Sequence, residues 1–71
     1  MASVIDHASR LRSLRIALDW SQLHMGEALG LEGDAGSIRT RVHQMEIGAR
    51  SVTGPIAKLI TLLAERHDIE L

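Results

Sequence analysis

Ser21–Gly48 reads SQLHMGEALGLEGDAGSIRTRVHQMEIG, and this stretch decides the fold of the 71-residue chain. Met25 and Leu29 lie four positions apart with Gly26 beside them, which predicts one face of a short helix that ends near Gly30. A second helix is expected after a polar break, because apolar residues recur there at i, i+4 and i+7. These apolar residues are Ile38, Val42 and Met45. One side of the second helix should therefore be core, while the other side consists almost entirely of hydrogen-bonding groups.

Gly26 is expected to let these two helices approach closely. Two short helices that cross steeply need a small residue where their axes meet, and glycine has no side chain. Glycine also costs roughly 1 kcal/mol of helix propensity relative to alanine, so an accidental glycine would only weaken the helix. With Gly30 four residues later, the interpretation as a closely paired helix is preferred.

Several positions of this stretch match one known pattern. They are Ser21-Gln22, Met25, Gly26, Leu29-Gly30-Leu31, Val42 and Glu46-Ile47-Gly48. The stretch thereby resembles the helix-turn-helix of the Cro and lambda-repressor-type (Xre-like) family, in its subgroup of small phage or mobile-element regulators. The resemblance extends from Leu11 to Leu63. It implies an all-α fold, a compact four-helix lambda-repressor-like domain over residues 1–71 that binds double-stranded DNA through residues 21–47.

One departure from the family pattern lies between Gly30 and Glu46, which are further apart than in the family. The excess is assigned to Leu31–Gly36, so the tight turn between the two helices should become an extended loop. This loop carries Glu32 and Asp34, which phosphate groups would repel. We therefore expect the loop to bulge away from the DNA and merely to link the helices.

The ends of the first two helices are predicted from capping residues. Ser3 and Asp6 have the spacing of a capping box with a shorter acid, so the first helix should begin near Ser3 and run to about Leu18. Ser21 is expected to cap the second helix, because a serine hydroxyl at that position accepts from the backbone of the first turn.

The other two helices are predicted in the same way. The third helix should start near Gly36 or Ser37, and Gly48 should adopt the left-handed conformation that ends it. The fourth helix should follow a turn that contains Pro55, which suits a first helical turn, and run to about Arg66.

DNA contacts are predicted from helical position together with the resemblance. Residues expected to read base edges lie opposite the apolar stripe of the third helix and are Arg39, Thr40, His43 and Gln44. Arg39 suits a guanine, Gln44 an adenine and Thr40 a thymine methyl group. Residues expected to hold phosphates are Gln22, Ser37, Arg41 and Arg50. The alternative is that these side chains form an ordinary solvated helix face.

Arg15 is expected to form a structural ion pair. It lies within the inward stripe of the first helix, among Leu11, Leu14 and Leu18, where an unpaired guanidinium group would be costly to desolvate. Glu46 lies one turn beyond Val42 on the inner side of the third helix, and the resemblance implies an arginine–glutamate bridge at these two positions. The alternative is that Arg15 reaches outward to water.

Composition favours a small homodimeric domain. A chain of this length buries only about 60% of its unfolded surface, so marginal stability as a monomer is expected. Residues 54–71 supply more apolar side chains than so small a core needs, and the expected dimer interface consists of Ile56, Leu59, Ile60, Leu63 and Ile69. A two-fold interface there would place the recognition helices about 34 Å apart, one DNA turn. The alternative is a monomer with a broad buried face; the conformation of residues 67–71 stays open.

Other chemistries find little support in the sequence. There is no cysteine, and the four histidines have no zinc-binding spacing, so neither a metal site nor a cofactor is expected. No serine stands in a nucleophile motif, so catalysis is not expected. No apolar run approaches the roughly 18 residues of a membrane span, which together with the lack of cysteine favours a cytoplasmic protein without membrane contact.

Two functions remain open. The first is a sequence-specific transcriptional repressor that acts as a homodimer on a palindromic operator, which the polar groups at the family's contact positions favour. The second is an antitoxin or protein-interaction module on the same fold, with a toxin as its partner. The net charge of −1 favours the second, although residues 36–58 are locally basic and coincide with the expected recognition helix.

Overall fold

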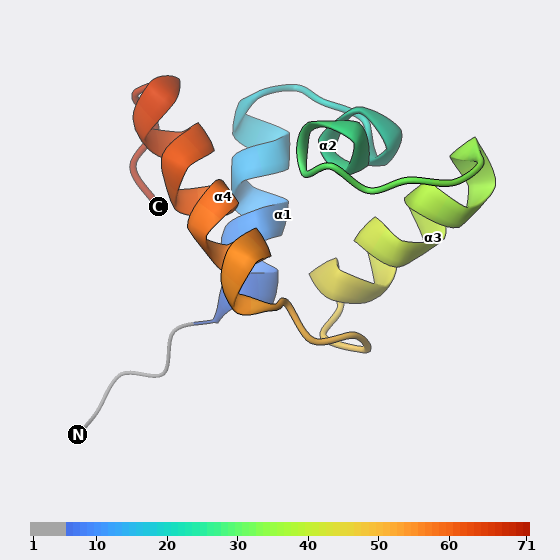
Figure 1. Ribbon diagram of the computed structural model, residues 1–71. Coiled ribbons are helices and arrows are strands. Elements are labelled where there is room, and N and C mark those ends of the chain that lie inside the picture. Colours follow the sequence, from blue (N-terminus) through green and yellow to red (C-terminus); the bar gives the residue numbers. More distant parts are fainter. Residues whose placement is uncertain (1–5) are drawn as a thin grey trace.

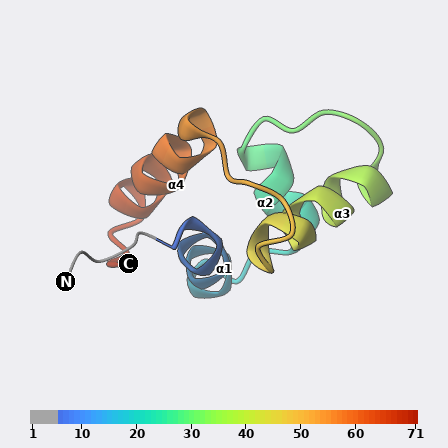
Figure 2. The same cartoon turned by 90° about the horizontal axis from the view of Figure 1, so that it is seen from below.

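Residues 6–71 of the computed structural model are described, and they form four helices without a strand (Figure 1). The helices are α1 (His7–Ala17), α2 (Gln22–Ala28), α3 (Ala35–Glu46) and α4 (Gly54–Arg66). α4 packs against α1 on one side of the molecule, whereas α2 and α3 pack together on the other (Figure 2). The predicted all-α class is thus confirmed for this part of the chain.

The core lies where the four helices meet. Its buried members are Leu11, Leu14, Met25, Leu29, Val42, Met45, Ile60 and Ala64. The predicted inward stripe of α3 is confirmed, because Ile38, Val42 and Met45 are all buried. The opposite side of α3 faces outward, since Arg39, Thr40 and His43 are exposed; it is called the free side of α3 below.

α2 and α3 approach each other closely at Gly26, as predicted. This residue is buried, and a Cβ atom added to it would overlap the Cγ2 atom of Ile38 and lie 3.1 Å from Cγ2 of Val42. A side chain here would therefore push α2 away from α3, which explains a glycine inside a short helix.

The starts of α1 and α2 are set by side-chain caps. The Oδ1 atom of Asp6 accepts a hydrogen bond from the backbone N–H of Ser9 at 3.1 Å, and Asp6 itself has an extended backbone. The predicted start at Ser3 lies outside the described residues, but a helix running through Asp6 is wrong, since Asp6 is the cap and α1 begins at His7. For α2 the prediction is confirmed: the Ser21 hydroxyl oxygen accepts from the N–H of His24 at 3.0 Å.

α3 begins slightly earlier than predicted. Its cap is Asp34, whose Oδ1 atom accepts from the N–H of Ser37 at 2.9 Å, so the helix starts at Ala35 rather than at Gly36 or Ser37. The last residues of the predicted loop therefore belong to the first turn of the helix. α4 starts at Gly54, with Pro55 in its first turn, and ends at Arg66 as predicted.

Each of the four helices described ends in the same pair of backbone hydrogen bonds. At the end of α3, Gly48 N–H donates to the Met45 carbonyl at 3.3 Å and Ala49 N–H donates to the Gln44 carbonyl at 2.8 Å. This is the Schellman arrangement, and it needs a residue of positive φ after the C-cap. These residues are Asp19 (φ 58°), Gly30 (φ 82°), Gly48 (φ 80°) and Asp68 (φ 57°). The predicted role of Gly48 is confirmed, whereas aspartate fills the same role after α1 and α4.

The connection between α2 and α3 bows outward (Figure 2), yet it is fastened to the fold. Leu31 packs against the core, and the guanidinium group of Arg41 donates to the backbone carbonyl of Glu32. Asp34 supplies the cap of α3. The expectation that this segment merely links the helices is therefore wrong. It contributes an apolar side chain to the core, the N-cap of α3 and a hydrogen-bond acceptor for Arg41.

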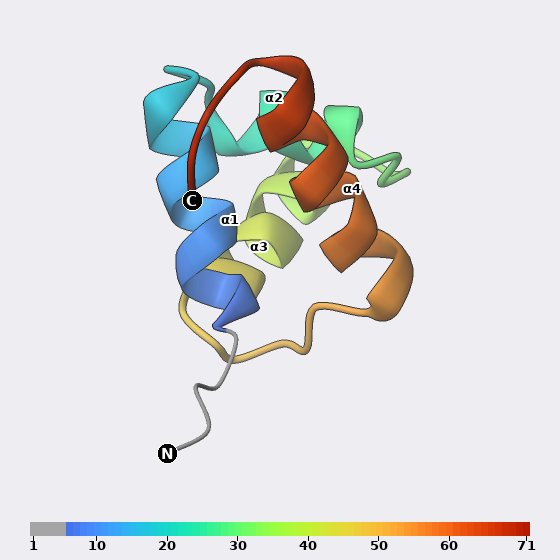
Figure 3. The same ribbon diagram turned by 90° about the vertical axis from the view of Figure 1, so that its left-hand side faces the viewer.

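α4 corrects part of the predicted dimer interface. Ile60 is fully buried in the core, so it cannot contact a second chain. The other predicted interface residues, Ile56, Leu59, Leu63 and Ile69, are half-buried and pack against the core cluster. Leu62 is instead the exposed apolar residue of α4. After α4 the chain turns back past α1 without forming a helix or strand (Figure 3).

Candidate nucleic-acid interface

The free side of α3 carries the four residues predicted to read bases. Arg39, Thr40 and His43 are exposed, and Gln44 is half-buried. They lie at i, i+1, i+4 and i+5, opposite the buried stripe of the same helix, because successive residues of an α-helix are about 100° apart. The structure therefore brings all four to one surface.

Arg50 extends this surface beyond the end of α3. Its backbone N–H donates to the Gln44 carbonyl at 3.1 Å, and its side-chain Nε donates to Gln44 Oε1 at 3.1 Å. A shallow depression connects the predicted base-reading residues with the predicted phosphate-binding ones. It is lined by Gly36, Ser37, Thr40, Arg41, Gln44 and Arg50. Gln44 and Arg50, which were predicted to act separately, are thus a hydrogen-bonded pair.

Two further predicted phosphate-binding residues, Ser37 and Arg41, also have partners within the fold. The hydroxyl group of Ser37 lies 3.2 Å from Asp34 Oδ2, and Arg41 holds the carbonyl group of Glu32. The backbone N–H and then the hydroxyl group of Ser37 hold the pKa of Asp34 below its usual range, so this carboxylate stays charged at neutral pH. A phosphate group at Ser37 would meet that charge, so this end of α3 is the less favourable end for DNA backbone.

Arg15 and Glu46 form the predicted ion pair on the inner side of α3. Arg15 Nε donates to Glu46 Oε2 at 2.6 Å and Arg15 Nη2 donates to Glu46 Oε1 at 3.0 Å, which is a two-bond, side-by-side geometry. The Glu46 side chain is 3% exposed and that of Arg15 is 19% exposed. The hydrogen bonds from the guanidinium group to Glu46 raise the pKa of Arg15, which keeps it protonated.

Two further groups complete this cluster. Arg15 Nη1 donates to the Trp20 carbonyl at 3.2 Å, and Gln22 Nε2 donates to Glu46 Oε1 at 3.3 Å. Gln22, which was predicted to hold a phosphate, therefore has its amide nitrogen turned toward the ion pair. The cluster joins α1, α2 and α3 at one point, because each of these helices supplies one side chain and the turn before α2 supplies the Trp20 carbonyl.

Because Glu46 is buried, its negative charge does not contribute to the free side of α3. Residues 35–58 contain no other carboxylate, and this one is neutralised by Arg15. The cationic residues of the same stretch are Arg39, Arg41, Arg50 and Lys58. The free side of α3 and the segment after it thus present positive charge with no exposed carboxylate among them.

One aromatic cluster was missed by sequence reasoning. The ring of Trp20 stacks on that of His24, with centroids 4.2 Å apart and planes 17° from parallel, and His67 meets Trp20 edge-on at 5.6 Å. The spacing of four residues between Trp20 and His24 was the available signal for the first contact. The second contact joins the start of α2 to the end of α4, which no local pattern encodes.

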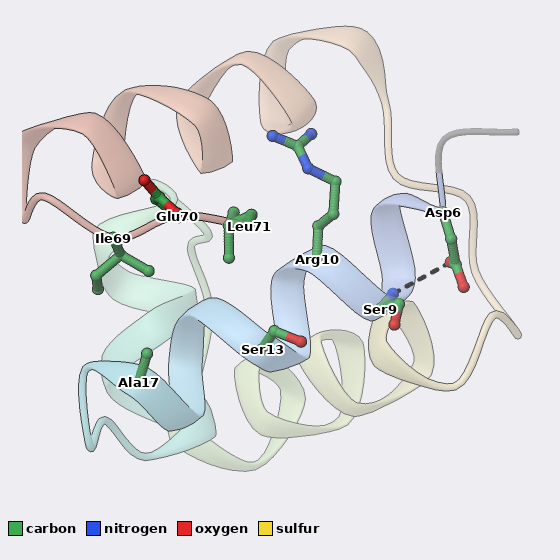
Figure 4. Close-up of a pocket in the computed structure, with 8 residues that line it drawn as sticks. All are labelled: Asp6, Ser9, Arg10, Ser13, Ala17, Ile69, Glu70 and Leu71. Carbon is green, nitrogen blue, oxygen red and sulfur yellow. Dashed lines mark hydrogen bonds between the residues drawn. The ribbon is translucent and has the colours of Figure 1, made fainter. Parts of the chain in front are cut away.

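The rest of the described surface offers little for chemistry. Within residues 6–71, no set of three or more histidine, aspartate or glutamate side chains is placed to hold a metal ion. None of the helices in this range has the length and apolarity needed to cross a bilayer. Figure 4 shows a groove between α1 and the final residues that is lined by groups of both charges. Its arginine, Arg10, already donates to the Thr61 hydroxyl group at 3.1 Å.

Comparison of the chain with protein-family models, curated proteins and solved structures finds no match. The role of the α3 surface therefore rests on its own chemistry. It combines a helix with a rigid inner side, guanidinium and amide donors that can form paired hydrogen bonds, and an absence of exposed carboxylates along residues 35–58. Such a set of groups suits a polyanion whose edge carries hydrogen-bond acceptors.

Proposed function

We propose that this chain is a sequence-specific DNA-binding regulator of the lambda-repressor-like, helix-turn-helix type, in which α2 and α3 form the motif and α3 enters the major groove. The proposal is carried by one observation. The free side of α3 gathers Arg39, Thr40, His43 and Gln44, while the only carboxylate of this helix is buried against Arg15. A major groove about 12 Å wide admits an α-helix, and each base pair presents a distinct pattern of donors and acceptors there.

The groups on α3 differ in what they can recognise. Arg39 can donate two parallel hydrogen bonds to the O6 and N7 atoms of guanine, and Thr40 can touch a thymine methyl group. Gln44 can pair with adenine, with Arg50 next to it at the DNA backbone. Because Asp34 is charged at the start of α3, the backbone of the DNA should run closer to Arg50 than to Ser37.

The proposed regulator acts as a homodimeric repressor on a palindromic operator. The half-buried residues Leu59 and Leu63 and the exposed Leu62 give α4 an apolar surface for a second copy. Sedimentation at tens of micromolar, with and without DNA, tests the dimer separately from DNA binding. A monomer under both conditions would contradict the proposed homodimer. DNA binding through α3 would not be affected by that result.

A second candidate is an antitoxin or protein-interaction module, with a toxin as its partner. It is favoured by two exposed apolar residues that lie outside both the α3 surface and the proposed dimer surface, Ile16 and Leu71, and by the net charge of −1. The two candidates differ in which substitutions abolish function. Residues of α3 are decisive for the regulator, whereas Ile16 and Leu71 are decisive for the interaction module.

Selection of binding sites from a random duplex library tests the proposal directly. The 71-residue chain should enrich a sequence with two related half-sites. Arg39→Ala should weaken binding to the enriched sequence by about 1–3 kcal/mol and relax preference at one base pair per half-site. Arg12→Ala is the matched control, because Arg12 is an exposed arginine of α1 outside the α3 surface. No enrichment by the wild-type chain would overturn the proposal.

A further inference from the structure

Exposed large apolar side chains occur on several elements of residues 6–71, and one of them stands apart. Ile16 belongs to α1, Leu62 to α4 and Leu71 to the final segment, whereas Ile47 directly follows α3. Ile47 is also the most exposed of these four, at 61%. A single exposed apolar residue is ordinary on a protein surface, so its position rather than its exposure carries the inference.

Ile47 continues the register of α3. It is the C-cap of the helix, and its N–H donates to the carbonyl group of His43 at 3.0 Å, the bond expected for a residue one turn further along. A helical position at i+4 from His43 and i+7 from Thr40 lies on the same side as both. Ile47 is therefore part of the surface that carries the predicted base-reading residues.

The neighbours of Ile47 restrict what it can meet. His43, Thr40 and Gln44 are hydrogen-bonding groups, and Arg39 and Arg50 are cationic, so the surface as a whole matches a polyanion with acceptor edges. An isoleucine side chain makes no hydrogen bond. In the major groove the one apolar group offered by the four bases is the 5-methyl group of thymine.

We infer that Ile47 determines specificity in the proposed complex by packing on the 5-methyl group of a thymine, which rests on the proposed DNA-binding function. This contact lies toward the C-terminal end of α3. It extends the reading surface by one turn beyond His43 and assigns a preference for thymine to a position that the hydrogen-bonding residues do not specify.

The test compares three chains in binding-site selection from a random duplex library: wild type, Ile47→Ala and Ile16→Ala. Ile16 is the matched control, because it is an exposed isoleucine on α1, outside the α3 surface. Ile47→Ala should lose the preference for thymine at one position of each half-site and leave the other positions unchanged. Ile16→Ala should select the wild-type sequence. Thermal unfolding of all three should agree closely, since both side chains are largely exposed.

Replacing that thymine by deoxyuridine isolates the methyl group. It should weaken binding of the wild-type chain about fourfold per contact, the loss for one buried methyl group, and should not change binding of Ile47→Ala. If Ile47→Ala selects the wild-type sequence with thymine retained, or if deoxyuridine has no effect, the role of Ile47 is overturned while DNA binding stands. If the wild-type chain enriches no sequence at all, the proposed function itself has failed.

Discussion

Arg50 donates from its side-chain Nε to Gln44 Oε1 at 3.1 Å, and the two residues are joined a second time through the backbone. This pairing alters what each side chain does in the proposed complex. An amide group whose oxygen is held by an arginine has a fixed orientation, so Arg50 positions Gln44 in addition to meeting phosphate. From the sequence, Arg50→Ala would be expected to weaken all DNA sequences alike.

The pairing predicts instead that Arg50→Ala lowers both overall affinity and discrimination at the base pair contacted by Gln44. Arg50→Lys should keep the phosphate contact but lose the discrimination, because lysine has no Nε donor at that position. A double-mutant cycle with Gln44→Ala, measured by fluorescence anisotropy, should give a coupling energy of at least about 0.5 kcal/mol. Additive effects of the two substitutions would contradict the pairing.

The ion pair of Arg15 and Glu46 should dominate the stability of the α1–α3 contact. Glu46→Ala should lower the free energy of unfolding by roughly 3 kcal/mol or more, because it leaves a guanidinium group partly buried without its partner. Replacing both residues by leucine should recover much of this loss. Urea unfolding gives the values, with Glu32→Ala as an exposed control expected to change stability by less than about 0.5 kcal/mol. A Glu46→Ala effect as small as that of the control would contradict a structural role.

Gly26→Ala should be destabilising, although alanine is the better helix former by roughly 1 kcal/mol. The added Cβ atom overlaps Ile38 Cγ2, a methyl group on a stiff β-branched side chain, so α2 and α3 must shift apart. We expect a loss of about 1–3 kcal/mol, typical of an overpacked core. Gly54→Ala is the control, because a Cβ atom there has nothing within 4 Å. Equal unfolding midpoints for the two variants would mean that the helices are not in close contact at Gly26.

The cap of α3 should make stability depend on pH. Hydrogen bonds from Ser37 hold the pKa of Asp34 below its ordinary value in the folded chain. The folded state thus binds this proton more weakly than the unfolded state does, so the contribution is present above about pH 4 and is lost as the pH falls through the folded-state pKa. Asp34→Asn keeps an acceptor for the Ser37 N–H but cannot titrate. Unfolding at pH 7, 5 and 3 should show the advantage of wild type over Asp34→Asn shrinking toward acid, and a constant difference would rule out this linkage.

Asp19 offers a stabilising substitution. It has a φ of 58° at the end of α1, a conformation that glycine adopts without steric cost. Asp19→Gly should raise the free energy of unfolding by up to about 1 kcal/mol, and Asp19→Val should lower it, since a β-branched residue fits that conformation poorly. Thermal unfolding of the two variants in parallel would decide the matter. A more stable valine variant would show that this residue does not keep its left-handed conformation.

Local patterns predicted the parts of the fold that local physics controls. Ser21 and Gly48 mark helix ends because their roles depend on the backbone within one turn. The stripe of Ile38, Val42 and Met45 is predictable since a 3.6-residue period leaves one side apolar. The ion pair of Arg15 and Glu46 is not local, but it was predictable because a charge within an apolar stripe requires an opposite charge and Glu46 lies on the inner side of α3.

Other features depend on information that is not local. The apolar residues of α4 share one sequence pattern, so nothing in it separates Ile60, which is fully buried, from Leu62, which is exposed. Asp34 lies in a segment without periodicity, where several residues are able to cap a helix. The bond between Arg50 and Gln44 joins residues six apart across a helix end, and its geometry exists only after Gly48 has turned the chain.

The Schellman closures at the ends of all four helices between residues 6 and 71 also bear on how fast the chain folds. Each closure uses hydrogen bonds between residues only three or five positions apart, so the direction in which the chain leaves a helix is set before distant segments meet. Folding then requires only that a few helices, whose exit directions are already set, dock against one another. Chains dominated by such short-range contacts fold in microseconds to milliseconds, and we expect refolding of this domain in stopped-flow or temperature-jump experiments to fall within that range.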